Sequence, residues 1–170
     1  MHSLCICDII QPIMCIRKEL YTMKLTTVRE IYKNHKSFLE QEVTIGGWVR
    51  SNRDSKSFGF LSISDGSYFE QIQVVYHDAM KNFAEIAKTN VGAALIVSGK
   101  LLATPNAKQP FEIQANDIQV EGVSSPDYPL QKKRHTLEYL RTITHLRPRT
   151  NMFQAVFRVR SLIAYAIHQF

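Results

Sequence analysis

Apolar and polar residues alternate along most of the chain between Val43 and Val120, and this period of two constrains the fold more than any other feature. Successive side chains of a β-strand point to opposite faces, so the alternation predicts strands with one face in a core. A helix is predicted between the third and fourth strands, over Ala79–Lys88. The five predicted strands are residues 43–53, 58–64, 71–76, 93–102 and 111–120.

This order of three strands, a helix and two strands predicts an all-β domain with helical additions. It is the layout of the five-stranded OB-fold barrel, whose central strands bind oligonucleotides, although another small barrel could share it. A short helix is predicted before the barrel. The residues Thr27 to Glu30 match a capping box, and the helical spacing that follows continues to about His35.

The predicted hairpin Phe58–Tyr76 has an unusual outer face. If the aliphatic residues supply the core, aromatic rings and amides remain on the opposite side of the sheet. Single-stranded nucleic acid suits such a face, because bases stack on Phe and their edges pair with Gln. Two alternatives stay open: a loop or helix covers the rings, and Arg53 pairs with Asp54 or Asp65. The inward residues are Leu61, Ile63, Ile72 and Val74, and the outward ones are Phe58, Phe60, Gln71 and Gln73.

The positive charge is concentrated in one stretch. The chain of 170 residues has a formal net charge of +6. Between Pro126 and Arg160 stand eight Lys or Arg residues against Asp127 and Glu138, so this stretch carries the whole excess. A nucleic-acid phosphate contact and a merely solvated basic face are both compatible with it.

The first 22 residues differ from the rest and are interpreted as an N-terminal extension outside the fold, with Met23 as a second possible start. All three cysteines lie there, and the pair Cys5 and Cys7 lacks the further ligands that a zinc site needs. The apolar run near Pro12 is too short to span a bilayer. We therefore expect no metal site, no membrane segment and a cytoplasmic protein.

Two segments carry a family resemblance. These are "GWVRSNRDSKSFGFLSISDG" in the predicted barrel and "YPLQKKRHTLEYLRTITHLRPRTN", residues 128–151. Together they resemble the bacterial asparaginyl-tRNA synthetases, which are class II enzymes with an anticodon-binding OB domain before the catalytic domain. The resemblance covers residues 23–170. It implies an OB domain over 23–122, a hinge over 123–135, and the start of an α+β catalytic domain over 136–170 that is truncated within the first class II motif.

The resemblance also implies site residues. Arg53, Phe60 and Gln73 match positions that contact the anticodon in this family. Phe60 is expected to stack with the middle base, a uridine, and Gln73 to read its edge, while Arg53 binds nearby bases or phosphates. Phe58 matches no contact position. No catalytic residue is assigned, since the later class II motifs are absent from these 170 residues.

The function implied is that of an asparagine–tRNA ligase. Such an enzyme activates asparagine with ATP and Mg2+, transfers it to tRNA(Asn) and works as a homodimer, in which the apolar helix after Asn151 contributes to the interface. This chain alone is expected to bind no cofactor and to be inactive. Two alternatives are a free-standing OB module that binds tRNA or other single strands without catalysis, and an aspartyl enzyme that also charges asparagine tRNA. The hinge sequence argues against the latter.

Overall fold

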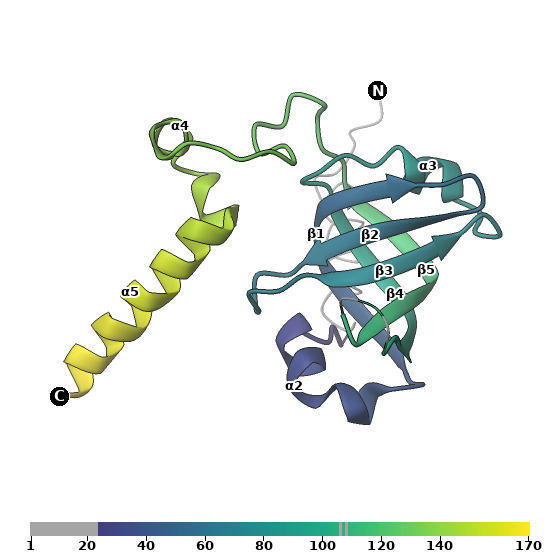
Figure 1. The fold of residues 1–170 in the computed structure, drawn as a ribbon, viewed down its shortest axis with the longest axis horizontal. Coiled ribbons are helices and arrows are strands. Elements are labelled where there is room, and N and C mark those ends of the chain that lie inside the picture. Colours follow the sequence, from purple (N-terminus) through teal and green to yellow (C-terminus); the bar gives the residue numbers. More distant parts are fainter. Residues whose placement is uncertain (1–23, 106, 108) are drawn as a thin grey trace, which may run out of the picture.

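A closed barrel forms the main body of the computed structural model, which describes residues 24–105, 107 and 109–170 (Figure 1). Its strands follow one another around the barrel in the order β1-β2-β3-β5-β4. The predicted five-stranded barrel with helical additions is confirmed. The strands are β1 (Glu42–Asp54), β2 (Phe58–Ser64), β3 (Ile72–His77), β4 (Ala94–Ala103) and β5 (Phe111–Gly122).

The long strand β1 makes closure possible. Its first half pairs antiparallel with β4, and its second half pairs antiparallel with β2 after a register shift between Val49 and Ser51. Such an irregularity bends a strand and lets one strand serve two neighbours. The barrel then closes through β3 and β5, which pair parallel at Val74↔Ile113 and Val75↔Gln114. Closure leaves no long exposed edge that could pair with another chain.

The barrel interior is filled by aliphatic and aromatic side chains from all five strands. The predicted inward residues Leu61, Ile63, Ile72 and Val74 are all completely buried. Tyr76 is also fully buried, and its hydroxyl donates to Asn52 Oδ1 at 3.0 Å. Gly59 lies against the Tyr76 ring, and a Cβ at this position would overlap that ring. The alternation of the sequence therefore predicted the core face of β2 and β3 correctly.

Helix α2 (Val28–Phe38) packs under the barrel, and the predicted capping box is present. Thr27 Oγ1 accepts from the Glu30 amide at 3.2 Å, and Glu30 Oε2 accepts from the Thr27 amide at 2.9 Å. Asp65, in the loop between β2 and β3, accepts from the Val28 amide at 2.8 Å. The helix extends beyond the predicted end near His35, with a local break in helical geometry at Asn34.

The helix predicted over Ala79–Lys88 is much shorter in the structure, where α3 comprises only Phe83–Ala87. Turns replace its first half, since the Met80 amide bonds to the His77 carbonyl and the Phe83 amide to the Met80 carbonyl. The Asn82 side chain donates to the Ile118 carbonyl of β5 at 2.5 Å. This tertiary bond ties the start of α3 to the barrel, which local helical spacing could not reveal.

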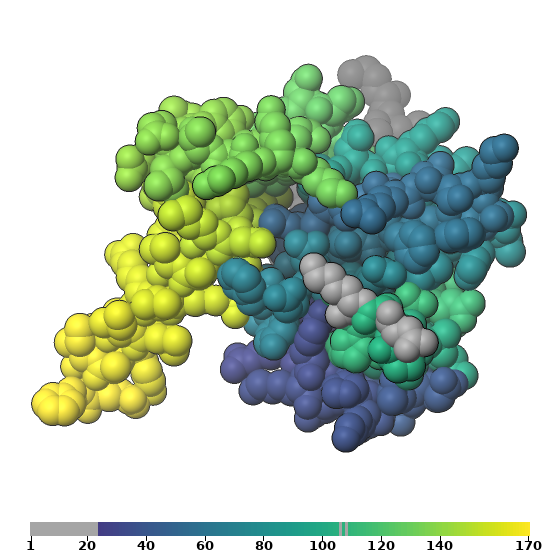
Figure 2. All heavy atoms as spheres, in the orientation of Figure 1, coloured from purple at the N-terminus to yellow at the C-terminus, as the bar shows by residue number. Residues whose placement is uncertain are grey.

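The chain leaves the barrel after β5 and ends in a long helix. Residues 123–136 contain neither helix nor strand. Then follow α4 (Leu137–Thr142), the 3-10 turn η1 (Arg147–Arg149) and α5 (Asn151–Gln169). Helix α5 projects away from the barrel (Figures 1 and 2).

The polar side chains at the start of α5 bond outside the helix. Thr150 stands at the N-cap position, but its hydroxyl donates to the Arg147 carbonyl at 2.7 Å and caps no helix amide. The Asn151 side chain is also engaged elsewhere, as acceptor of a bond from Arg50 at 3.3 Å. Both polar groups therefore join the helix to η1 and to the barrel.

Candidate nucleic-acid interface

The outer face of β1, β2 and β3 forms an open groove of about 850 Å³. The three residues predicted to contact RNA, Arg53, Phe60 and Gln73, all line it. Arg53 on β1 lies directly opposite Phe60 on β2, and Gln73 on β3 lies opposite Ser62 on β2. Three neighbouring strands thus present a cation, an aromatic ring and an amide on one surface, where a base with its phosphate could bind.

Phe60 is half-buried, so part of its side chain remains open to the groove. Phe58 does not line the groove, and its ring meets the Phe60 ring edge-on with centroids 5.4 Å apart. This edge contact supports one side of the Phe60 ring without occupying the groove.

A carboxylate holds the Gln73 side chain in one orientation. Gln73 Nε2 donates to Glu112 Oε2 of β5 at 3.2 Å. An ionised carboxylate only accepts hydrogen bonds, so the amide nitrogen and not the oxygen must face it. The Gln73 carbonyl oxygen makes no hydrogen bond to any described residue and is available as an acceptor.

The loop between β4 and β5 is fastened to the same groove by Gln109. Its Oε1 accepts from the Gln73 amide at 3.1 Å, and its Nε2 donates to the Tyr32 hydroxyl at 3.0 Å and to the Gln71 carbonyl. Tyr32 in turn donates to the Gln71 carbonyl at 2.8 Å. These bonds link α2, β3 and the loop in one network, so the wall of the groove is already ordered before any ligand binds.

Tyr32 is the most perturbed titratable group in the groove. Its burial raises the pKa of the hydroxyl to about 12. The hydroxyl therefore stays protonated near neutral pH and can donate to Gln71 while it accepts from Gln109. The ring is stacked on Tyr68, with centroids 4.6 Å apart.

Arg53 is exposed and, among the described residues, has no hydrogen-bonded or ion-pair partner. The alternative of a pair with Asp54 or Asp65 is not realised. Asp65 instead accepts hydrogen bonds from Val28 and Ser67. The guanidinium at the rim of the groove is therefore free to meet a phosphate or a base.

Sequence reasoning missed Glu112, Gln109 and Tyr32. Glu112 could have been found from the alternation, because Phe111 and Ile113 on either side of it point into the core. Its position beside Gln73 could not, since that depends on the parallel pairing of β3 with β5. Gln109 lies in a loop and Tyr32 in a helix, where strand alternation carries no signal.

In residues 24–105, 107 and 109–170, no group of three or more His, Cys, Asp or Glu side chains could hold a metal ion. The predicted absence of a metal site at Cys5 and Cys7 concerns a segment outside the described residues. None of the described helices is long and apolar enough to cross a membrane.

Comparisons with known proteins confirm the resemblance to asparaginyl-tRNA synthetases. Residues 43–121 match the OB-fold nucleic acid binding domain family. The chain is 59% identical to the asparagine–tRNA ligase of Acetivibrio thermocellus over 149 residues, which are 87% of this chain and 32% of that protein. It is 60% identical to the enzyme of Desulfitobacterium hafniense over 148 residues, again 87% and 32%. The chain thus spans about a third of the length of these relatives.

Solved structures agree on the fold. The asparaginyl-tRNA synthetase of Pyrococcus horikoshii superposes with a TM-score of 0.76 at 21% identity, over 87% of this chain and 34% of that one. A putative aspartyl-tRNA synthetase of Leishmania major gives a TM-score of 0.73 at 15% identity, over 87% and 32%. The same arrangement of barrel and following helices therefore occurs in both.

Proposed function

Because residues 43–121 belong to the OB-fold nucleic acid binding family and the chain resembles asparagine–tRNA ligases closely, we propose that it is the anticodon-binding part of such a ligase. The barrel binds the anticodon of tRNA(Asn). The observation that carries this proposal is the groove itself, in which Arg53, Phe60 and Gln73 lie on three adjacent strands. A half-buried ring, a guanidinium without a partner among the described residues and an oriented amide therefore lie together in one open groove.

Phe60 supplies a flat surface for one anticodon base. Stacking of a base on an aromatic side chain contributes about 1–3 kcal/mol to binding and does not depend on sequence. The ring is half-buried and supported by Phe58, so it loses little side-chain freedom when a base binds.

Gln73 supplies the sequence selectivity. Its carbonyl oxygen is the free end of the amide, because Glu112 holds the nitrogen. A carbonyl accepts a hydrogen bond from the N3–H of uracil, whereas N3 of cytosine carries no hydrogen and would face the carbonyl as a second acceptor. The groove therefore suits a uridine at the middle position of the anticodon and disfavours a cytidine.

The whole protein would join asparagine to tRNA(Asn) with ATP and Mg2+, with both cofactors held outside the described residues. We place the anticodon-binding domain at residues 23–122, the hinge at 123–135 and the start of the catalytic domain at 136–170. In the whole protein, α5 contributes to a homodimer interface. We expect the whole protein to act in the cytoplasm, where the rest of the translation apparatus is found.

The test is a titration of the chain with an anticodon stem-loop RNA that has uridine at the middle position. Phe60→Ala is expected to weaken binding by about 1–3 kcal/mol, because the stacking surface is lost. Folding should change little, since Phe60 is not among the buried core residues. The matched control is Phe170→Ala, which removes an exposed ring that neither lines this groove nor contacts Phe60.

Two outcomes would contradict the proposal. Equal affinities of the wild type and Phe60→Ala would remove the stacking role. Equal affinities of the wild type for stem-loops with uridine and with cytidine at the middle position would remove the anticodon function.

A further inference from the structure

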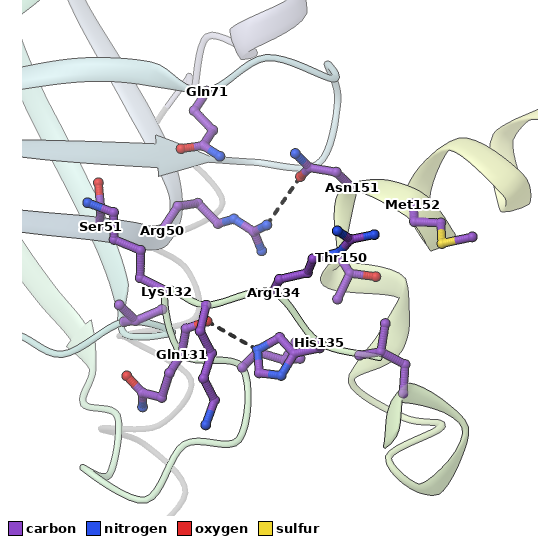
Figure 3. A pocket seen from close by; sticks show the side chains of 14 residues that line it. Arg50, Ser51, Gln71, Gln131, Lys132, Arg134, His135, Thr150, Asn151 and Met152 are labelled. Carbon is purple, nitrogen blue, oxygen red and sulfur yellow. Dashed lines mark hydrogen bonds between the residues drawn. The ribbon is translucent and has the colours of Figure 1, made fainter. Parts of the chain in front are cut away.

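A second groove of about 660 Å³ lies between the barrel and the segment that follows it (Figure 3). We propose that this groove binds the phosphodiester backbone of the same RNA whose anticodon bases occupy the barrel groove. The inference rests on the proposed function and adds to it a separate binding site. The ligand class is a polynucleotide backbone, recognised by charge and not by base sequence.

The two grooves are continuous. Ser51, Gln71 and Asn151 line both of them. Figure 3 shows the barrel side chains Arg50, Ser51 and Gln71 on one side, with Asn151 at the start of α5 across from them. An RNA strand that leaves the barrel groove past these shared residues therefore reaches the second groove directly.

The outer wall of the second groove is strongly cationic. Lys132, Lys133 and Arg134 follow one another along it and are all exposed. Their side chains make no hydrogen bond or ion pair with any residue that the structure describes. No Asp or Glu is among the described residues that line the groove. Three unpaired cations without a compensating carboxylate attract a polyanion.

Arg50 belongs to the wall and is not one of the binding cations. Its guanidinium donates to the Arg149 carbonyl at 2.5 Å and to Asn151 Oδ1 at 3.3 Å. Burial lowers the pKa of Arg50, as expected for a cation taken out of water. Arg149 lies over the ring of Trp48, 5.1 Å from its centroid. These contacts tie the start of α5 to β1 and so hold the two sides of the groove together.

The cationic segment is held in place by hydrogen bonds of its neighbours. Gln131 Nε2 donates to the Tyr128 carbonyl at 2.7 Å and to the Pro126 carbonyl at 3.3 Å. His135 donates from Nε2 to the Gln131 carbonyl at 3.2 Å, and its ring stacks on Tyr139 with centroids 5.4 Å apart. The backbone on both sides of the three cations is thereby fixed, which lowers the entropy lost when RNA binds.

Salt dependence distinguishes a phosphate site from a base-reading site. Each phosphate that a cation neutralises releases counterions, which adds about 0.7 to the slope of log affinity against log salt for a single strand. The variant Lys132→Gln, Lys133→Gln, Arg134→Gln is expected to lower that slope by about 2 with an anticodon stem-loop RNA, and to weaken uridine and cytidine stem-loops by the same factor. The charge-preserving variant Lys132→Arg, Lys133→Arg, Arg134→Lys should keep the wild-type slope.

The matched control removes three exposed lysines from other surfaces, in the variant Lys33→Gln, Lys36→Gln, Lys81→Gln. It is expected to change the slope far less than the groove variant does. Equal slopes for the groove variant and the control would overturn the second site and leave the anticodon proposal standing. A loss of slope in the groove variant combined with no effect of Phe60→Ala would support the second site and overturn anticodon recognition instead.

Discussion

The barrel and helix α5 differ in how far their apolar side chains are buried. In the barrel, every strand turns its aliphatic side chains inward, and Leu61, Ile63 and Ile72 have no exposed surface. In α5 the apolar residues face outward, with Leu162 69% exposed and Ile167 69% exposed. Both regions carry many apolar residues, yet only the barrel covers its own.

The difference lies in what each region contacts within the described chain. The barrel closes on itself through five strand pairings. Helix α5 is held near its N-terminus, by Arg147 over the rings of Phe153 and Phe157 and by a 2.6 Å bond from Arg158 to the Gly66 carbonyl. An open apolar hollow on the same helix is lined by Val156, Ile163 and other residues. The barrel is thus a self-sufficient unit, whereas α5 needs another surface.

The largest expected effect compares one leucine from each region. Leu61→Ala removes a fully buried side chain from the barrel and should lower the free energy of unfolding by about 2–5 kcal/mol. Leu162→Ala on α5 removes an exposed side chain and should change it by no more than about 0.5 kcal/mol. Urea denaturation of both variants gives the comparison. Similar losses for both would mean that α5 is buried in solution.

The next effect concerns the uncovered face of α5. The chain is expected to self-associate at micromolar concentrations, because several exposed apolar side chains lie together and fully burying each contributes roughly 1.5–3 kcal/mol. The double variant Val156→Asp, Ile163→Asp should be a monomer, since both residues line the apolar hollow on α5. Light scattering with both proteins measures this. The matched control is Leu25→Asp, an exposed apolar residue outside α5, which should still associate.

The RNA affinity of that double variant tests the comparison further. Neither Val156 nor Ile163 lines the barrel groove that contains Phe60, so the affinity for the stem-loop should remain unchanged. A wild-type protein that stays monomeric at tens of micromolar would show that the exposed face of α5 does not drive association.

The sequence alone could predict the features that depend on the local periodicity of apolar and polar residues. The strand faces and the Thr27 capping box follow from neighbours in sequence. The site residues on β1 to β3 come from the family resemblance, and their contact with RNA stays a prediction. The missed features depend on tertiary contacts: Glu112 reaches Gln73 through a parallel strand pair, and Asn82 shortens α3 through a bond to β5. Thr150 bonds backward to Arg147, which its position before the helix does not indicate.

A further prediction concerns the Glu112 carboxylate, which orients the Gln73 amide. With Glu112→Gln, residue 112 can donate as well as accept, so the Gln73 amide is no longer held with its nitrogen toward β5. We expect the preference for uridine over cytidine at the middle position to fall by about 1 kcal/mol. Titration of both stem-loops measures this ratio. Gln114→Glu, an exchange at the next outward position of β5, should leave the preference intact, and an unchanged ratio in Glu112→Gln would contradict the orienting role.

The last comparison uses one tyrosine of α2, the helix that packs on the barrel, and one tyrosine of α5. Tyr32→Phe removes a hydroxyl that joins α2 to the groove, and should cost about 1 kcal/mol of stability near pH 7. Tyr165→Phe on the exposed surface of α5 should change stability by less than about 0.5 kcal/mol. Urea denaturation again measures both.

The pH dependence separates the hydroxyl of Tyr32 from a simple packing effect. Its folded-state pKa is raised from 10.0 to about 12, so the contribution is fully present below pH 10 and is lost as the pH rises through 12. The wild type should therefore lose stability between pH 10 and 12 more steeply than Tyr32→Phe. Parallel curves for the wild type and Tyr32→Phe over this range would show that ionisation of this hydroxyl is not linked to folding. The wall of the groove would then be held by the hydrogen bonds of Gln109 and of the Gln71 backbone alone.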